Sequence, residues 1–159
     1  MSEVRGLSAA EVALCGSVFG AVLDPAAVTV RRRAWFWFQP RHITMAPDGH
    51  IWCHPGGDVW RACFADDSLA TQAFFIHEMT HVWQHQSGLN LVFRRLPFAR
   101  YRYELKAGKP FHRYGIEQQA CIVADAFLAR AGVLRQAPLA AYAAVLPFPG
   151  WAASTAASN

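Results

Sequence analysis

The stretch FFIHEMTHVWQHQSG, residues 74–88, determines how the rest of this sequence is interpreted. Its central part, HEMTH, matches the H-E-x-x-H pattern. Residues four apart lie on one face of a helix, so the imidazoles of His77 and His81 can converge on one metal ion. Glu78 is turned by about 100° from His77, where it can take a proton from water beside the ion. The pattern therefore predicts a zinc site with His77 and His81 as ligands and Glu78 as the catalytic base.

The residues around the motif predict a long helix with one apolar face. A polar residue among positions 66–68 can cap its start, and Gly88 can end it. At about 100° per residue, five apolar side chains gather opposite the two histidines: Phe75, Ile76, Met79, Val82 and Trp83. We expect this apolar stripe to pack against strands within residues 28–53. The histidines should face a cleft that solvent reaches.

A catalytic zinc ion usually has three protein ligands, so a third must come from elsewhere in the chain. His85 is a poor candidate, because it lies two helical turns, roughly 12 Å, from His77. His112 and Glu104 can reach the ion from the segment between the two long helices. We favour Glu117, because it lies in the first turn of the second helix. Packing that helix on the first would direct its carboxylate to the histidines.

The second long helix is expected over residues 114–132, and it carries two further candidates. Tyr114, one turn before Glu117, is the first choice for the donor that stabilises a developing oxyanion. The same segment offers three other donors: Tyr101, Tyr103 and His112. Asp125, two turns after Glu117, can hydrogen-bond a ligand histidine. Plain packing or capping roles explain Tyr114 and Asp125 equally well.

The rest of the sequence predicts a single small α+β domain over residues 1–151, with a flexible tail over residues 152–159. The domain should combine the two long helices with a small antiparallel sheet. The other expected elements are a helix over 8–22, strands over 28–30 and 35–38, a hairpin over 42–54, a candidate strand over 101–105 and a short helix after Pro138.

Composition restricts the class of protein. Of 159 residues, 53% are hydrophobic and 16% charged, enough for a core without disulfides. The four cysteines form no C-x-x-C pair, which argues against a cysteine zinc knuckle and favours buried thiols, although Cys53 and Cys63 can still pair.

No apolar run reaches the roughly 20 residues of a membrane span. Glu11 interrupts the apolar N-terminal stretch, so we expect synthesis in the cytoplasm without a signal peptide.

Two basic stretches give the chain its net charge of +4. One is Arg31–Arg33, and the other lies within residues 94–113. Basic residues mixed with aromatic ones are found in nucleic-acid-binding proteins. A solvated basic face is the simpler interpretation, so we do not expect a nucleic-acid partner.

Two segments together resemble a known family: FFIHEMTHVWQHQSG, and RYGIEQQACIVADAFLA at residues 113–129. They are similar to the zinc metallopeptidase toxin domains carried by Vgr-type spike proteins of bacterial type VI secretion systems and their Vgr-related relatives. The similarity spans about residues 68–130. It implies a zincin-like fold with a gluzincin-like arrangement of ligands, Zn²⁺ as cofactor, Glu117 as third ligand and delivery to the periplasm of a competing cell. A secretion spike as carrier and an immunity protein are the implied partners.

The expected function is therefore hydrolysis of a peptide or amide bond, in a protein or in peptidoglycan, by an antibacterial effector. Two alternatives remain open. One is a non-catalytic, zinc-stabilised module of a secretion apparatus, which predicts that Glu78 can be replaced without loss. The other is a nucleic-acid-binding domain, which predicts DNA affinity that falls steeply with salt.

Overall fold

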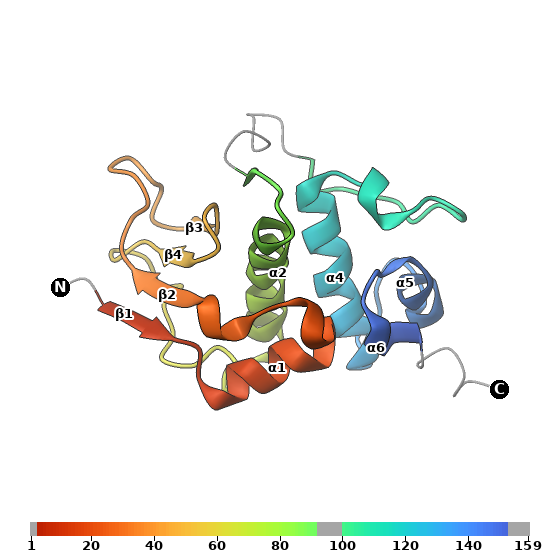
Figure 1. The fold of residues 1–159 in the computed structure, drawn as a ribbon, viewed down its shortest axis with the longest axis horizontal. Helices are drawn as coiled ribbons and strands as arrows, with labels where there is room; N and C mark the ends of the chain where they lie inside the picture. The colour runs from red at the N-terminus through yellow and green to blue at the C-terminus, as the bar shows by residue number, and fades with distance from the viewer. Residues whose placement is uncertain (1–2, 92–99, 153–159) are drawn as a thin grey trace.

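A computed structural model describes residues 3–91 and 100–152 of the protein. In chain order the elements are β1 (Glu3–Gly6), α1 (Ala9–Phe19), η1 (Gly20–Val22), η2 (Pro25–Ala27), β2 (Thr29–Arg32), β3 (Thr44–Met45), β4 (Ile51–Cys53), α2 (Leu69–Gln86), η3 (Phe111–Arg113), α4 (Ile116–Arg130), α5 (Leu139–Val145) and α6 (Pro149–Ala152). Helix α2 crosses the middle, with the strands on one side and α4, α5 and α6 on the other (Figure 1). Helices combined with one small sheet confirm the predicted α+β class.

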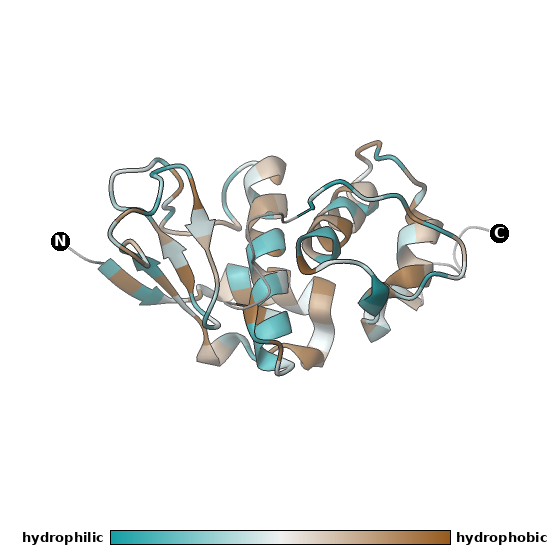
Figure 2. Ribbon diagram, turned by 90° about the horizontal axis from the view of Figure 1, so that it is seen from above, coloured by the Kyte–Doolittle hydropathy of each residue, from teal (hydrophilic) through white to brown (hydrophobic). Residues whose placement is uncertain are grey.

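The strands form one sheet in the order β1-β2-β4-β3. Strand β2 pairs antiparallel with β1 and parallel with β4. Strands β3 and β4 pair antiparallel, and the turn between them contains Gly49, whose φ of 82° favours glycine. The hairpin predicted for residues 42–54 is confirmed, whereas the sheet is mixed and not purely antiparallel. Seen from above, the sheet lies beside α2 and opposite the helical half (Figure 2).

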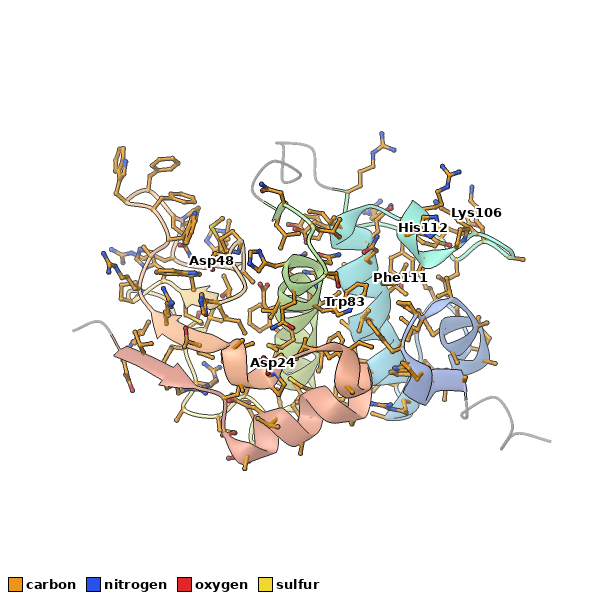
Figure 3. All side chains as sticks on the ribbon, in the orientation of Figure 1. Asp24, Asp48, Trp83, Lys106, Phe111 and His112 are labelled. Atoms are coloured by element: carbon orange, nitrogen blue, oxygen red, sulfur yellow. The ribbon has the colours of Figure 1, made fainter. Side chains whose placement is uncertain are left out.

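The strand predicted for residues 35–38 is wrong, because the chain turns there. The buried side chain of Gln39 accepts a hydrogen bond from the Trp35 amide at 2.7 Å and donates one to the Ile43 carbonyl at 2.6 Å. These two bonds close a loop between β2 and β3, from which ring side chains project outward (Figure 3). Four consecutive aromatic residues have strand propensity but lack the alternation that buries one face.

The candidate strand at residues 101–105 is also wrong. Its backbone is irregular and is held by side chains of α4: Gln118 donates to the Arg102 carbonyl at 2.7 Å, and Asp125 accepts a hydrogen bond from the Tyr103 hydroxyl. The strands in the described part of the chain all belong to the one sheet, so this segment has no strand beside it.

Helix α1 begins with the capping box that the sequence predicts. The Ser8 hydroxyl accepts a hydrogen bond from the Glu11 amide at 3.1 Å, and the Glu11 carboxylate accepts one from the Ser8 amide at 2.8 Å. The α-helix ends at Phe19 and continues as the 3₁₀ turn η1 to Val22, close to the predicted end.

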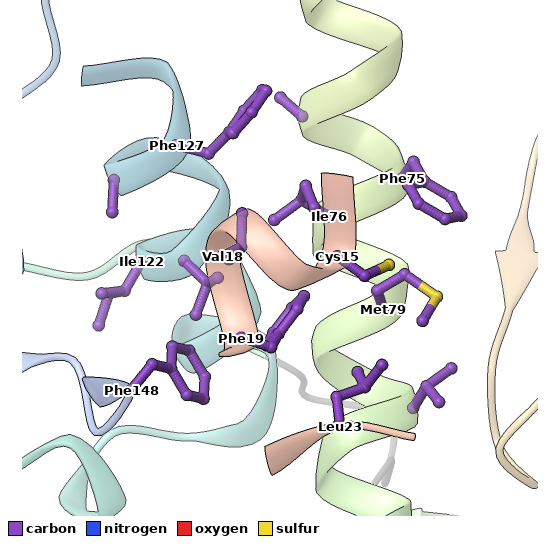
Figure 4. Close-up of a cluster of buried hydrophobic side chains, with 14 of the residues drawn as sticks. Cys15, Val18, Phe19, Leu23, Phe75, Ile76, Met79, Ile122, Phe127 and Phe148 are labelled. Carbon is purple, nitrogen blue, oxygen red and sulfur yellow. The ribbon is translucent and has the colours of Figure 1, made fainter. Parts of the chain in front are cut away.

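The core lies between α1, α2, α4 and the sheet (Figure 4). Four residues of the predicted stripe on α2 are fully buried in it: Phe75, Ile76, Met79 and Val82. Sheet residues such as Val30 and Ile51 share this core, which confirms the predicted packing against residues 28–53. Helix α1 also covers this stripe, a contact that was not predicted, and α4 shares the same core, in line with its predicted packing on α2.

All four cysteines are free, so the pairing of Cys53 with Cys63 does not occur. The Cys63 thiol lies 3.1 Å from the Ser8 hydroxyl, and Cys53 is buried in the sheet. Burial, together with the nearby Glu78 carboxylate, raises the pKa of the Cys53 thiol to about 12. The interpretation as buried thiols therefore holds for Cys15 and Cys53, whereas Cys63 and Cys121 are half-buried.

The C-terminal end of the described chain packs on α1. The indole of Trp151 in α6 is buried and donates a hydrogen bond to the Val18 carbonyl at 2.8 Å. Beyond Ala152 the predicted tail lies outside the described residues, so the limits 1–151 and 152–159 stay a prediction. Among the helices that the structure describes, none has the length and apolarity to cross a bilayer.

Replacing Glu11 by glutamine is expected to lower the free energy of unfolding by about 3 kcal/mol, because it breaks a buried charge pair. Glu11 is fully buried, and its carboxylate accepts hydrogen bonds from Arg5 at 2.7 and 2.8 Å and from the Phe64 amide at 2.8 Å. Urea unfolding measures the change. Glu3→Gln is the control, because Glu3 is exposed and lies 3.9 Å from its partner Arg32.

The buried Glu11 carboxylate also makes the free energy of unfolding depend on pH. Burial raises the pKa of Glu11, but hydrogen bonds from Arg5, Phe64 and Ser8 outweigh it and hold the pKa below 4.5. Because the pKa is lower in the folded state, the stabilisation is complete above pH 4.5 and is lost as pH falls through the folded value. Acid destabilisation of equal size in Glu11→Gln and the unchanged protein would contradict this assignment.

Candidate metal centre

The two histidines of the motif lie one turn apart on α2, with ring centroids 5.1 Å apart. His81 is fully buried, whereas the side chain of His77 is 17% exposed. Solvent therefore reaches the pair from the His77 side only. We expected both histidines to be reached by solvent; His77 is partly exposed and His81 is not.

Glu117 approaches the histidines from α4. One of its carboxylate oxygens lies 3.3 Å from His77 Nε2 and 3.1 Å from His81 Nε2. Glu117 has this position because α4 begins just before it: Gly115 is the N-cap, and its amide donates to the Gln118 side chain at 2.9 Å. Helices α2 and α4 then pack along their length, which places the first turn of α4 over the middle of α2.

The donor set suits a metal ion. One ligand atom from each of His77, His81 and Glu117 can be chosen so that all three lie within 4.8 Å of one another. Among the described residues, this is the one group of three or more histidine, cysteine or acidic side chains with such spacing. Two imidazole nitrogens and a carboxylate oxygen are a catalytic zinc donor set that leaves a fourth position open.

The hydrogen bonds of Gln84 determine which nitrogen of His81 faces Glu117. The Gln84 amide nitrogen donates to the Ile116 carbonyl at 3.0 Å and to the Gln119 side-chain oxygen at 2.9 Å. Its oxygen is therefore left to accept from His81 Nδ1, 2.8 Å away. In the neutral imidazole the proton is then on Nδ1, and the lone pair of Nε2 points to the Glu117 carboxylate. Two such electron-rich atoms 3.1 Å apart favour a cation between them.

His77 has a different neighbour at its Nδ1 atom, the Cys121 thiol on α4 at 3.9 Å. Its Nε2 faces Glu117 at 3.3 Å. Burial, with the nearby Asp125 and Glu117 carboxylates, raises the pKa of Cys121 to about 12. Cys121 is therefore a neutral thiol near neutral pH, and it packs beside the histidine.

Glu78 lies outside the ligand group, as the motif predicts. Its side chain is 5% exposed and lies on the sheet side of α2, close enough for its charge to raise the pKa of Cys53 in β4. The carboxylate is therefore held in a largely dry position, on the same turn of α2 as the two histidines. A carboxylate in such a position is suited to proton transfer.

The other ligand candidates lie elsewhere. His85 and Glu104 are exposed, and neither joins the His77 group. His112 is exposed and lines an apolar groove of about 880 Å³ with Trp83, Lys106 and Phe111 (Figure 3). The structure therefore brings Glu117 to the histidines and leaves the three alternatives apart from them.

The predicted supporting residues have other partners. The hydroxyl of Tyr114 accepts a hydrogen bond from the Lys106 amide at 3.1 Å, and the ring faces the Lys109 ammonium at 4.2 Å. Its role as an oxyanion donor stays a prediction, which these contacts do not support. Asp125 accepts hydrogen bonds from Tyr103 and Arg135. Gln84, which sequence reasoning missed, is the residue that orients a histidine; its position three residues after His81 was the available signal.

Replacing Gln84 by methionine is expected to weaken zinc binding about 10- to 100-fold, because His81 loses the acceptor that orients it. Gln84→Glu keeps an acceptor for Nδ1 but cannot donate to the Ile116 carbonyl. It should therefore lose stability while keeping most of the affinity. Competition with a fluorescent chelator measures the affinity, and thermal unfolding of the zinc-free proteins measures stability. Equal affinities in the two variants would assign Gln84 a purely structural role.

Comparisons with known proteins agree with this architecture. No protein-family profile matches the chain. The chain is 40% identical over 134 residues to the type VI secretion system spike protein VgrG2b of Pseudomonas aeruginosa, covering 78% of this chain and 13% of that much longer protein. The solved effector domain of P. aeruginosa VgrG2b superposes with a TM-score of 0.73 at 40% identity, covering 80% of this chain and 75% of that domain. The chain therefore belongs to the family of the VgrG2b effector domain.

Proposed function

We propose that the protein is a zinc-dependent hydrolase of peptide bonds, in which His77, His81 and Glu117 hold the metal. The observation that carries the proposal is the convergence of both Nε2 atoms on one Glu117 oxygen, at 3.3 and 3.1 Å. Helix α2 supplies the two histidines and Glu78 from a single turn, and α4 supplies the glutamate. This division of ligands between two packed helices is that of a gluzincin-like site.

The chain's own residues divide the chemistry between them. When bound, zinc supplies Lewis-acid activation of a water molecule and of the scissile carbonyl. Glu78 accepts the proton of the attacking water at its carboxylate and then donates it to the leaving amine. Gln84 keeps His81 in the tautomer that binds through Nε2. Glu78, His81 and Glu117 are buried, so few water molecules can reach the reacting bond from their side. His77 is partly exposed, and the substrate enters from its side.

The biological role we propose is that of an antibacterial effector. The family relation to the VgrG2b effector domain supports delivery by a type VI secretion spike into the periplasm of a target cell. The substrate class is then a periplasmic protein or the peptide stem of peptidoglycan. A producing cell would need an immunity protein against such an activity.

The test is a hydrolysis assay on protein loaded with one equivalent of zinc. Casein and purified peptidoglycan stem peptides serve as substrates, and newly formed amino termini are quantified by mass spectrometry. We expect cleavage of one of the two classes, loss of activity with a chelator and recovery on addition of zinc. Intact substrates in both classes, with zinc bound to the protein, would favour the non-catalytic module.

A further inference from the structure

The loop of residues 33–43, called the aromatic loop below, has no part in the metal centre. Its tip exposes Trp37 to 91% and Phe38 to 65%, unusual for large apolar side chains. The loop stands away from the body of the protein between β2 and β3 (Figure 1), and ring side chains project from its end (Figure 3). Neighbouring Ile43 is also exposed. The exposed apolar residues thus form a protruding tip and do not line a recess.

The aromatic loop is held in this shape before any partner binds. Buried Gln39 ties the Trp35 amide to the Ile43 carbonyl through its side chain, and the Gln39 amide donates to the Phe36 carbonyl at 3.1 Å. Trp35 packs edge-to-face on Trp52 of β4, with ring centroids 5.0 Å apart. A preordered loop loses little conformational entropy when its tip is buried by a partner.

Arginines surround the base of the aromatic loop. Arg33 and Arg41 are exposed at its two ends, and the Arg31 guanidinium lies 4.6 Å from the centre of the Trp52 ring. The sequence has no acidic residue between Asp24 and Asp48. The region is therefore layered, with apolar rings at the tip and positive charge behind them.

We propose that the aromatic loop docks the protein on the surface of an anionic phospholipid membrane. The layering of the loop matches that of a bilayer, in which acyl chains lie below anionic headgroups. Tryptophan favours the interface between these layers, and arginine is attracted to the headgroups. Single-stranded nucleic acid is bound differently, in basic grooves whose aromatic residues stack on the bases, and the tip is not part of a groove. The bilayer is therefore the partner that fits both the shape and the charge.

The docking is tested with vesicles. The full chain should sediment with vesicles of phosphatidylcholine and phosphatidylglycerol in roughly equal parts, and less with phosphatidylcholine alone. The variant Trp37→Ala/Phe38→Ala should bind about 10- to 100-fold more weakly, because the transfer of two rings is lost. The variant Arg33→Gln/Arg41→Gln should bind more weakly to the anionic vesicles. Its binding to them should fall to the level seen with phosphatidylcholine alone. Both pairs are exposed, and circular dichroism verifies their folding.

Two control variants should bind vesicles like the unchanged protein. Leu134→Ala removes an equally exposed apolar side chain, 94% exposed after α4, and should bind like the unchanged protein. Glu78→Gln should also bind normally, which separates this proposal from the hydrolase. Vesicles with brominated acyl chains should quench the fluorescence of Trp37, and this quenching should disappear in Trp37→Phe.

Failure to bind the anionic vesicles, or equal binding by Trp37→Ala/Phe38→Ala, would overturn the proposal. Binding of a single-stranded oligonucleotide that needs Trp37, without vesicle binding, would assign the loop to nucleic acid instead.

Discussion

Glu78→Gln is expected to lower the rate of peptide hydrolysis by ~10²–10⁴-fold while zinc stays bound, because general-base assistance contributes about this much. The side chain keeps its size and lies outside the ligand group, so the zinc content should remain near one equivalent. The melting temperature should change little for the same reason. Single-turnover assays on the zinc-loaded protein measure the rate. Glu104→Gln, which removes an exposed acid away from the centre, is the matched control and should retain full activity.

The same variant distinguishes the hydrolase from a zinc-stabilised module in cells. Directed to the periplasm of a test bacterium, the unchanged chain should stop growth and Glu78→Gln should not. A variant that keeps its zinc and remains fully toxic would contradict the enzymatic account. His77, His81 and Glu117 would then serve only to stabilise the fold.

His81→Ala is expected to lower zinc affinity more than ~100-fold, beyond the range for residues that only orient a ligand. His81 is fully buried, and its Nε2 lies 3.1 Å from a Glu117 oxygen. No exposed side chain can therefore move in to take its place as a ligand. Added zinc should raise the melting temperature of the unchanged protein, because a ligand that binds only the folded state stabilises it. The effect should be absent in His81→Ala.

His85→Ala is the control for this loss of zinc, because His85 lies one turn further along α2 but is exposed. It should retain both the zinc and the thermal shift. Glu117→Ala should behave like His81→Ala. If Glu117→Ala kept full affinity and a variant at His112 or Glu104 lost it, the third ligand would have to be reassigned.

The parts of the fold that depend on local signals were predictable. Helix α2 follows from a cap at Ser68, an apolar stripe and a stop at Gly88, all within the same short stretch. The β3–β4 hairpin follows from the turn around Gly49 in the same way. The placement of Glu117 needed one further assumption, that α4 packs on α2. That assumption was reasonable because the histidines require a third ligand.

The parts that depend on distant contacts were not predictable. Strand β1 is a short polar segment, EVRG, which becomes a strand only because β2 offers an edge to pair with. The parallel pairing of β2 with β4 has no local signature. The aromatic loop has the composition of a strand, and only the buried Gln39 shows that it turns. Gln84 orients His81 through contacts with α4, which sequence spacing alone cannot establish.

The most direct test of the metal centre is X-ray diffraction from crystals of the zinc-loaded protein, recorded on both sides of the zinc absorption edge. The account predicts one anomalous peak at about 2.0–2.2 Å from His77 Nε2, His81 Nε2 and a Glu117 oxygen, with Glu78 outside bonding distance. A zinc peak held by other residues, with these three side chains hydrogen-bonded only to one another, would contradict it.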